Sequence, residues 1–133
     1  MVTLQVADLM RTRFEQIQGD VPLRRFIDDK LLRSDQVCWP VLEADRPVGL
    51  ISIESIRAKV SEDASRLSVA DAMDELGDAV RPDLRGRDAL KFLLASKRDP
   101  IPVVEAGYVV GLLHHADLMR WLALHQLENQ LRI

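Results

Sequence analysis

An internal repeat constrains the fold of this 133-residue chain more than any other feature. Three short runs occur twice, in the same order and 62 or 63 residues apart. They are Val-Ala-Asp-Leu-Met at 6–10 and Val-Ala-Asp-Ala-Met at 69–73, Pro-Val at 40–41 and 102–103, and Val-Gly-Leu at 48–50 and 110–112. Such self-similarity predicts two copies of one supersecondary unit. We place the two domains at residues 1–62 and 63–133.

Each copy contains an amphipathic helix between its first and second repeated runs. Apolar residues recur there at helical spacing, which predicts one face turned toward a core. This face consists of Ala89, Leu90, Leu93 and Leu94 in the second copy and of Phe26, Ile27 and Leu31 in the first. The second of these helices is expected between Arg87 and Ser96.

Two strands and a second helix follow in each copy. The apolar runs at 37–42, 48–53, 101–104 and 109–113 are too short and too rich in β-branched residues for helices. Turn residues at 44–47 and 105–107 predict two hairpins. Helices should begin near Glu54 and Ala116, and a short strand is expected after Met10 and Met73. The predicted fold class is therefore α+β (α/β).

The last helix, at 116–131, is longer than its counterpart in the first copy. Leu118, Leu122 and Leu127 share a face, and Met119 and Leu131 lie close to it. These residues either cap the core or pack on a second copy or another partner. The sequence leaves both alternatives open.

Charge and cysteine content narrow the class of protein. The 18 basic and 21 acidic residues are scattered along the chain, which predicts no basic face and no nucleic-acid partner. Cys38 lies in an apolar run and is expected to be a buried thiol in the reducing cytoplasm. No apolar run reaches about 18 residues and no signal peptide is evident, so we expect a soluble chain. Any membrane-spanning part of a parent protein would lie outside this sequence.

The repeated runs resemble those of the CBS domain. The Val-x-Asp-x-Met opening, the Pro-Val strand and the Val-Gly-Leu strand that leads into a helix carry the resemblance. The pair resembles the two-domain Bateman module over essentially the whole chain. This resemblance implies two small sheets with packed helices, related by a pseudo-twofold axis. It also implies clefts for an adenine nucleotide (AMP, ADP or ATP) or S-adenosylmethionine, and a homodimer.

A narrower resemblance concerns the segments 26–32, 39–52 and 110–122. They look like the CBS tail of some site-2 protease homologues, which are membrane-embedded zinc metalloproteases. The resemblance implies a protease domain in the same parent chain, with this module on the cytoplasmic side. The His-Glu-x-x-His signature of such a protease is absent from the sequence, so we assign no catalytic residue to this chain.

Nucleotide-binding CBS repeats have the pattern Gly-hydrophobic-x-Ser/Thr-x-x-Asp, in which the Asp binds ribose hydroxyls. The first copy keeps the hydroxyl as Ser52 but has Ser55 in place of the Asp. The second copy keeps Asp117 but has His114 in the hydroxyl position, where it could face a phosphate when protonated. An ionised carboxylate accepts two hydroxyl hydrogen bonds, so the second copy is the better candidate. The alternative is that Asp117 caps the helix that it opens.

The resemblance places the base of a ligand between apolar strand residues. These are Ile101 and Pro102 in the second copy, with Trp39 and Pro40 at the matching place in the first. Trp39 and Trp121 could stack on a base, but aromatic residues in such apolar surroundings are more often core residues.

Metal binding and catalysis are not expected. His114 and His115 are adjacent at a strand end, so their side chains point in opposite directions and do not form a ligand pair. No pairing of nucleophile and base is visible. We therefore predict a regulatory ligand-sensing module that modulates an attached membrane metalloprotease. The alternative is a ligand-free dimerisation module whose nucleotide motifs are degenerate.

Overall fold

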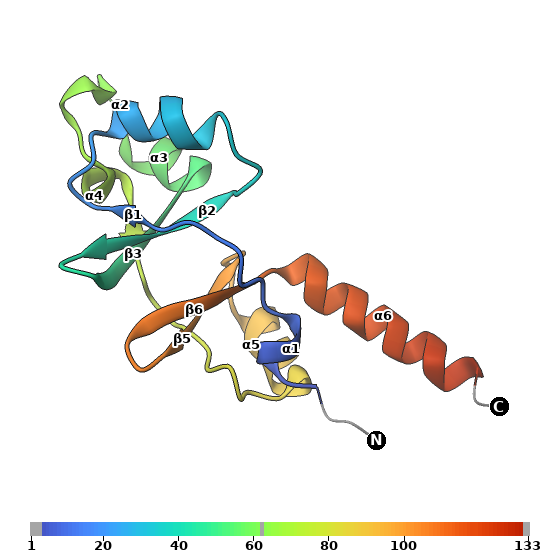
Figure 1. The fold of residues 1–133 in the computed structure, drawn as a ribbon. Helices are drawn as coiled ribbons and strands as arrows, with labels where there is room; N and C mark the ends of the chain where they lie inside the picture. Colours follow the sequence, from blue (N-terminus) through green and yellow to red (C-terminus); the bar gives the residue numbers. More distant parts are fainter. Residues whose placement is uncertain (1–3, 62, 132–133) are drawn as a thin grey trace. The chain divides into compact units, whose positions relative to one another are not determined.

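The computed structural model describes residues 4–61 and 63–131, which form two compact units (Figure 1). The middle unit comprises Phe14–Gly77. The terminal unit comprises the described residues up to Arg13 and those from Asp78 onward. The opening segment of each sequence repeat thus lies in the unit that contains the body of the other repeat. The division after residue 62 follows the sequence repeat and stays a prediction, whereas the compact units divide the chain after Arg13 and after Gly77.

The middle unit is built on a four-stranded sheet in the order β1-β2-β3-β4. Its elements are β1 (Ile17–Gln18), α2 (Leu23–Phe26) continued by a π-helix (Ile27–Leu31), β2 (Cys38–Glu43), β3 (Arg46–Ser52), α3 (Ile53–Lys59), a 3₁₀ helix (Ala64–Arg66), α4 (Val69–Ala72) and β4 (Asp74–Glu75). β1 is parallel to β2, and the other neighbours are antiparallel. The short strand expected after Met73 is therefore confirmed as β4.

The terminal unit repeats this arrangement in reduced form. Its elements are α1 (Val6–Leu9), α5 (Gly86–Ala95), β5 (Ile101–Glu105), β6 (Tyr108–Leu113) and α6 (His115–Leu131). β5 and β6 pair antiparallel. Single bridges take the places of the outer strands, Val80 to Val103 in parallel and Arg11 to Leu112 antiparallel. The predicted mixture of helices and small sheets is confirmed in both units.

The two hairpins share their irregularities. The register shifts between Val41 and Leu42 in one hairpin and between Val103 and Val104 in the other. Each two-residue turn has positive φ at both positions, 49° and 63° at Ala44 and Asp45, and 54° and 83° at Ala106 and Gly107. Such turns match the twist of the flanking strands. Both predicted hairpins are confirmed.

The contact between two repeated runs explains why they recur together. A Cβ added to Gly49 would lie 2.5 Å from Met73 Sδ, and one added to Gly111 would lie 2.4 Å from Met10 Sδ. The Asp of each Val-x-Asp-x-Met run accepts a hydrogen bond from a backbone N–H at the start of its short helix, Asp8 from Gln5 and Asp71 from Ser68. The Asp therefore holds the helix end, and the Gly admits the Met against the strand.

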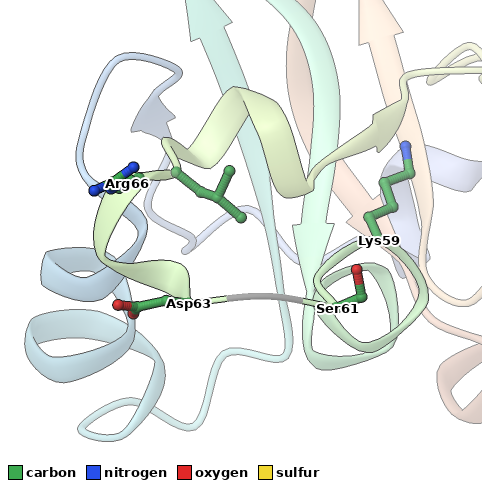
Figure 2. Close-up of a pocket in the computed structure, with 5 residues that line it drawn as sticks. Lys59, Ser61, Asp63 and Arg66 are labelled. Atoms are coloured by element: carbon green, nitrogen blue, oxygen red, sulfur yellow. The ribbon is translucent and has the colours of Figure 1, made fainter.

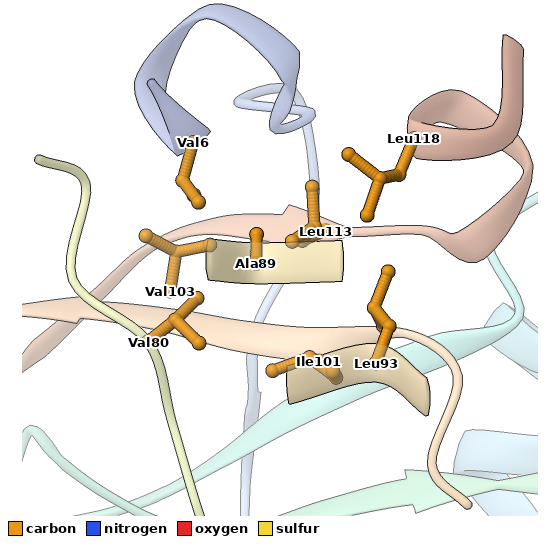
Figure 3. Close-up of a cluster of buried hydrophobic side chains, with 8 residues drawn as sticks. All are labelled: Val6, Val80, Ala89, Leu93, Ile101, Val103, Leu113 and Leu118. Atoms are coloured by element: carbon orange, nitrogen blue, oxygen red, sulfur yellow. The ribbon is translucent and has the colours of Figure 1, made fainter. Parts of the chain in front are cut away.

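Each unit has its own apolar core. The core of the terminal unit joins α1, α5, both strands and the start of α6 (Figure 3). Its residues are Val6, Val80, Ala89, Leu93, Ile101, Val103, Leu113 and Leu118. The core of the middle unit contains Leu23, Phe26, Trp39, Val41, Ile51, Val69 and Ala72. Cys38 is buried, as predicted.

The prediction is wrong for one residue of the apolar helix face at 87–96. Leu94 is 79% exposed. The buried side of α5 follows Gly86, Ala89 and Leu93, and Leu90 packs at its margin. Leu94 lies one residue beyond Leu93, about 100° further around the helix, and therefore faces solvent within this unit.

Only the start of α6 packs on the core, as the core-capping alternative predicts. Leu118 is buried and Leu122 is half-buried, whereas Met119, Leu127 and Leu131 are exposed. Within residues 4–61 and 63–131, no helix is both long enough and apolar enough to cross a membrane.

Candidate functional site

Asp117 lies in the first turn of α6, close to the end of β6. The backbone of Arg11 is fixed beside this strand, since Arg11 N donates to Leu112 O at 2.9 Å and Leu112 N donates to Arg11 O at 3.0 Å. The Arg11 side chain reaches the carboxylate of Asp117, with Nε at 2.8 Å from Oδ2 and Nη2 at 3.3 Å from Oδ1. The result is a two-point ion pair between segments 106 residues apart.

This ion pair remains accessible within its unit. The side chains of Arg11 and Asp117 are 55% and 29% exposed. The hydrogen bond from Arg11 lowers the pKa of Asp117 and raises the pKa of the guanidinium itself. Asp117 is therefore ionised at neutral pH, in the state that can accept hydrogen bonds from hydroxyl groups.

His114 connects β6 to α6 and is largely buried. Its side chain is 15% exposed, and Nδ1 lies 4.0 Å from Asp99 Oδ1. Burial, followed by the positive charge of Arg11, lowers the pKa of His114. The imidazole is therefore neutral at pH 7. The prediction that His114 faces a phosphate had relied on a protonated ring.

The N-terminus of α6 is capped by a residue other than Asp117. His115 N donates to Asp99 Oδ1 at 3.1 Å, and the His115 ring Nε2 lies 2.8 Å from Arg98 O. Asp117 itself lies two residues inside the helix. Sequence reasoning missed both Arg11 and Asp99, and the only local signal was the position of Arg11 directly after Met10 in a segment expected to be a strand.

The apolar residues predicted to hold a base are buried. Ile101 pairs with Leu113 and its side chain points into the core of the terminal unit (Figure 3). Pro102 is also buried and pairs with Leu112, the residue that bridges to Arg11. The structure thus brings Pro102, Arg11 and Asp117 to the same end of β6.

In the middle unit, the two predicted hydroxyl residues bind each other. Ser52 Oγ accepts from Ser55 N at 3.1 Å, Ser52 N donates to Ser55 Oγ at 2.9 Å, and Ser55 Oγ donates to Ser52 O at 3.0 Å. Ser55 is 1% exposed. Both side chains therefore form the N-terminal cap of α3.

Trp39 and Pro40 are core residues of the middle unit. Trp39 is fully buried and packs edge to face on Phe26, with ring centroids 5.1 Å apart. Pro40 is buried and pairs with Leu50. Among the described residues, the Trp39 indole Nε1 has no hydrogen-bond partner. Trp121 packs with His125 on α6, with the two rings stacked at 5.6 Å.

Two surface hollows lie in the middle unit, away from these residues. The first has a volume of about 370 Å³ and is lined by Lys59, Ser61, Asp63, Arg66 and Leu67 (Figure 2). The second, of about 400 Å³, is lined by Gln18, Gly19, Asp20, Leu42, Glu43, Ala44, Ser68 and Ala70. In the first hollow, Lys59 already binds Met73 O and lies 3.5 Å from Asp74. Hydrogen bonds from Ser65 lower the pKa of Asp63.

No three His, Cys, Asp or Glu side chains within the described ranges are grouped to hold a metal ion.

Comparison with known proteins gives a family match over part of the chain and solved structures with a similar fold. Residues 69–124 match the family model described as CBS domain. The fold resembles CBSX2 from Arabidopsis thaliana at 22% identity and a TM-score of 0.77, covering 96% of this chain and 99% of that one. It also resembles CBSX2 in complex with AMP, at 20% identity and a TM-score of 0.76, covering 90% and 96%.

A third solved structure is the hexameric CBS-CP12 protein from bloom-forming cyanobacteria. It is 18% identical, with a TM-score of 0.74, and the match covers 90% of this chain and 68% of that one. The sequence has no match among curated proteins. Residues 69–124 thus match the CBS-domain family model, and the chain has the fold of a CBS-domain pair, which confirms the broader of the two predicted resemblances.

Proposed function

We propose that the chain is a regulatory module that binds an adenine nucleotide at the start of α6, with Asp117 as the ribose-binding residue. The observation that carries the proposal is the ionised and partly exposed carboxylate of Asp117 at the position where the CBS pattern has its ribose-binding Asp. The solved CBSX2 structure in complex with AMP supports the choice of ligand class.

The terminal unit is the better candidate of the two. In the middle unit, Ser55 occupies the position that corresponds to Asp117, and its hydroxyl is buried and bonded to Ser52. A ribose would have to displace these cap hydrogen bonds. At Asp117 the carboxylate keeps acceptor capacity beyond the two bonds from Arg11, since its two oxygens offer about four lone-pair sites.

Ligand binding can be measured on the folded chain. A nucleotide that binds only the folded state raises its melting temperature, so thermal shifts against AMP, ADP, ATP and S-adenosylmethionine provide the first test. Asp117→Ala should then weaken nucleotide binding about ten- to a hundred-fold, because a charge-assisted acceptor is lost. Ser52→Ala is the matched control and should leave the affinity close to that of the parent. Equal affinities for folded Asp117→Ala and the parent would refute the ribose role.

The same module is proposed to modulate an attached protein. The segments 26–32, 39–52 and 110–122 support a membrane-embedded metalloprotease of the site-2 type as that protein, with the module on the cytoplasmic side. A ligand would bias the protease by its different affinity for two arrangements of the module or its homodimer. Protease activity of a joined chain, measured with and without AMP, tests this. Identical activities would refute the regulatory coupling.

A ligand-free dimerisation module is the second candidate. The exposed apolar side chains of Met119, Leu124, Leu127 and Leu131 on α6 favour it. Light scattering at micromolar concentration distinguishes the states, since one chain has a mass of 15.1 kDa. A dimer with no thermal shift from any nucleotide would favour this second function over the first.

A further inference from the structure

The outer face of α5 combines an apolar side chain with two positive charges. Ala89 and Leu93 of this helix point into the core of the terminal unit (Figure 3). Leu94 is 79% exposed, and Arg87 and Lys91 are exposed as well. At about 100° per residue, the three exposed side chains lie within about 60° of one another, on the side turned away from the core. The helix thus places a leucine beside two cations on its outer surface.

The two cations of this face are not neutralised by the rest of the chain. Among the described residues, the side chains of Arg87 and Lys91 form no ion pair. They are four residues apart on one helix, so their like charges repel at a small cost in stability. The one acid in the sequence of α5, Asp88, is half-buried in the first turn, where its charge complements the helix dipole. The outer face is therefore positive, although the net charge of the whole chain is -3.

Charge and shape together distinguish the possible occupants of this face. A twofold contact with a second copy would bring the cations of both chains together, and like charges across an interface are unfavourable. An acidic protein would complement the charge, but it would need a pocket shaped for Leu94 on a convex helix surface. A lipid surface needs no such pocket, since its anionic head groups attract the cations and its acyl boundary accepts the leucine.

We propose that the outer face of α5 docks on a membrane surface that contains anionic lipids. Arg87 and Lys91 contact the head groups, and Leu94 is buried at the boundary between head groups and acyl chains. Long basic side chains keep their charges at the head groups while an apolar residue enters more deeply. Half-buried Leu90, one turn before Leu94, continues the apolar contact toward the unit. This surface is separate from the start of α6, and the proposal does not depend on nucleotide binding.

Sedimentation of the whole chain with lipid vesicles tests the docking. Vesicles of phosphatidylcholine alone are compared with vesicles of phosphatidylcholine and phosphatidylglycerol at low ionic strength. The parent chain should bind the mixed vesicles, bind phosphatidylcholine much less, and be released as salt is added. The double variant Arg87→Gln, Lys91→Gln should bind the mixed vesicles about thirty-fold more weakly, since each basic residue near an anionic surface contributes about a factor of five.

Leu94→Gln tests the apolar part of the contact. It should weaken binding to the mixed vesicles about five- to tenfold and leave the salt dependence in place, because both charges remain. Two matched controls come from the middle unit. The double variant Arg24→Gln, Arg25→Gln removes two exposed cations from α2, and Leu32→Gln replaces a leucine that is 73% exposed. Both controls should bind the mixed vesicles as the parent does.

The controls and the other occupants define the results that would overturn the proposal. Equal losses in the α5 and α2 double variants would assign vesicle binding to net charge. If the folded parent does not bind the mixed vesicles, docking on lipid is overturned. A dimer in light scattering that Leu94→Gln dissociates would then assign the face to a second copy, and binding of polyglutamate would assign it to an acidic protein. Melting temperatures show that each variant is folded, as expected for substitutions at exposed positions.

Discussion

The middle unit and the terminal unit share the backbone features of their hairpins but differ where the second strand leads into a helix. In the middle unit, Ser52 and Ser55 close this junction with hydrogen bonds to each other. In the terminal unit, the corresponding residues are His114 and Asp117, and the carboxylate binds Arg11 instead. The first junction is satisfied internally, whereas the second presents charged groups at the surface.

The ion pairs of the two units also have their charges exchanged: the residue after the repeated Met is basic in the terminal unit and acidic in the middle unit. Arg11 follows Met10 and binds an acid in the first turn of α6. Asp74 follows Met73, at the matching place, and lies 3.5 Å from Lys59 in the last turn of α3. Residues that fix the fold are thus repeated, and residues at the junction are not. This difference separates the structural motif from the groups that are available to a ligand.

The largest expected effect comes from the repeated glycines. Gly49→Ala should lower the free energy of unfolding by about 3 kcal/mol and Gly111→Ala by about 1 kcal/mol, as expected for overpacked contacts. The new Cβ at Gly49 would lie 2.5 Å from the backbone oxygen of Asp74, which cannot move away without disturbing the pairing of β3 with β4. At Gly111 the atoms in conflict belong to the flexible side chain of Met10. Urea unfolding of both variants measures the difference.

Met10→Ala supplies the control for this comparison. Removing Cγ and Sδ of Met10 should lessen the cost of Gly111→Ala in the Met10→Ala background, where the Cβ of residue 10 remains 3.0 Å from the added Cβ, and a double-mutant cycle would show this coupling. Equal losses for Gly49→Ala and Gly111→Ala in the parent would mean that the backbone contact at Asp74 adds nothing.

A smaller effect is expected at the serine junction. Ser52→Ala removes the side-chain acceptor for Ser55 N and should cost about 1 kcal/mol, as for other N-cap substitutions. The loss should be independent of pH between 7 and 3, because neither serine titrates. Ser61→Ala is a suitable control, since it changes the same side chain just beyond the other end of α3. An unchanged unfolding midpoint for Ser52→Ala would show that the Ser52 cap does not stabilise the fold.

The parts of the fold that depend on local pattern were predictable from the sequence. Turn residues such as Ala44-Asp45 lie between alternating apolar runs, and the spacing of Ala89 and Leu93 gives a helical face. Both signals act over a few residues. The prediction that Leu94 faces the core was wrong because an apolar pattern in the sequence does not fix which of two neighbouring positions is buried.

The candidate site was less predictable because its partners are distant in the chain. Asp117 was found from its spacing after Gly111, but its ion pair with Arg11 joins residues 106 positions apart. No local pattern encodes such a contact. The same reason explains why the exchange of opening segments between the two repeats was not foreseen, since the bridges of Gln5 to Arg85 and Pro22 to Ser68 join separate parts of the chain.

The smallest expected effect on the free energy of unfolding is at Asp117. Its dependence on pH distinguishes this junction from the serine junction. Asp117→Asn should lower the free energy of unfolding at pH 7 by less than about 1 kcal/mol, because the Arg11 side chain is more than half exposed and solvent screens the pair. The hydrogen bond from Arg11 lowers the pKa of Asp117 below its ordinary value of 3.8. The folded state therefore binds this proton less readily than the unfolded state, and the contribution is fully present only well above pH 3.8.

This contribution should disappear as the pH falls through the lowered pKa of Asp117. Urea unfolding of the parent and Asp117→Asn at pH 7, 5 and 3 measures the difference at each pH, and it should shrink at the lowest value. High salt at pH 7 should also reduce it. The deficit of Ser52→Ala, by contrast, should stay constant across the same series. If the deficit of Asp117→Asn were equally constant, the carboxylate would act through neutral hydrogen bonds, and the two junctions would be alike in everything but their residue types.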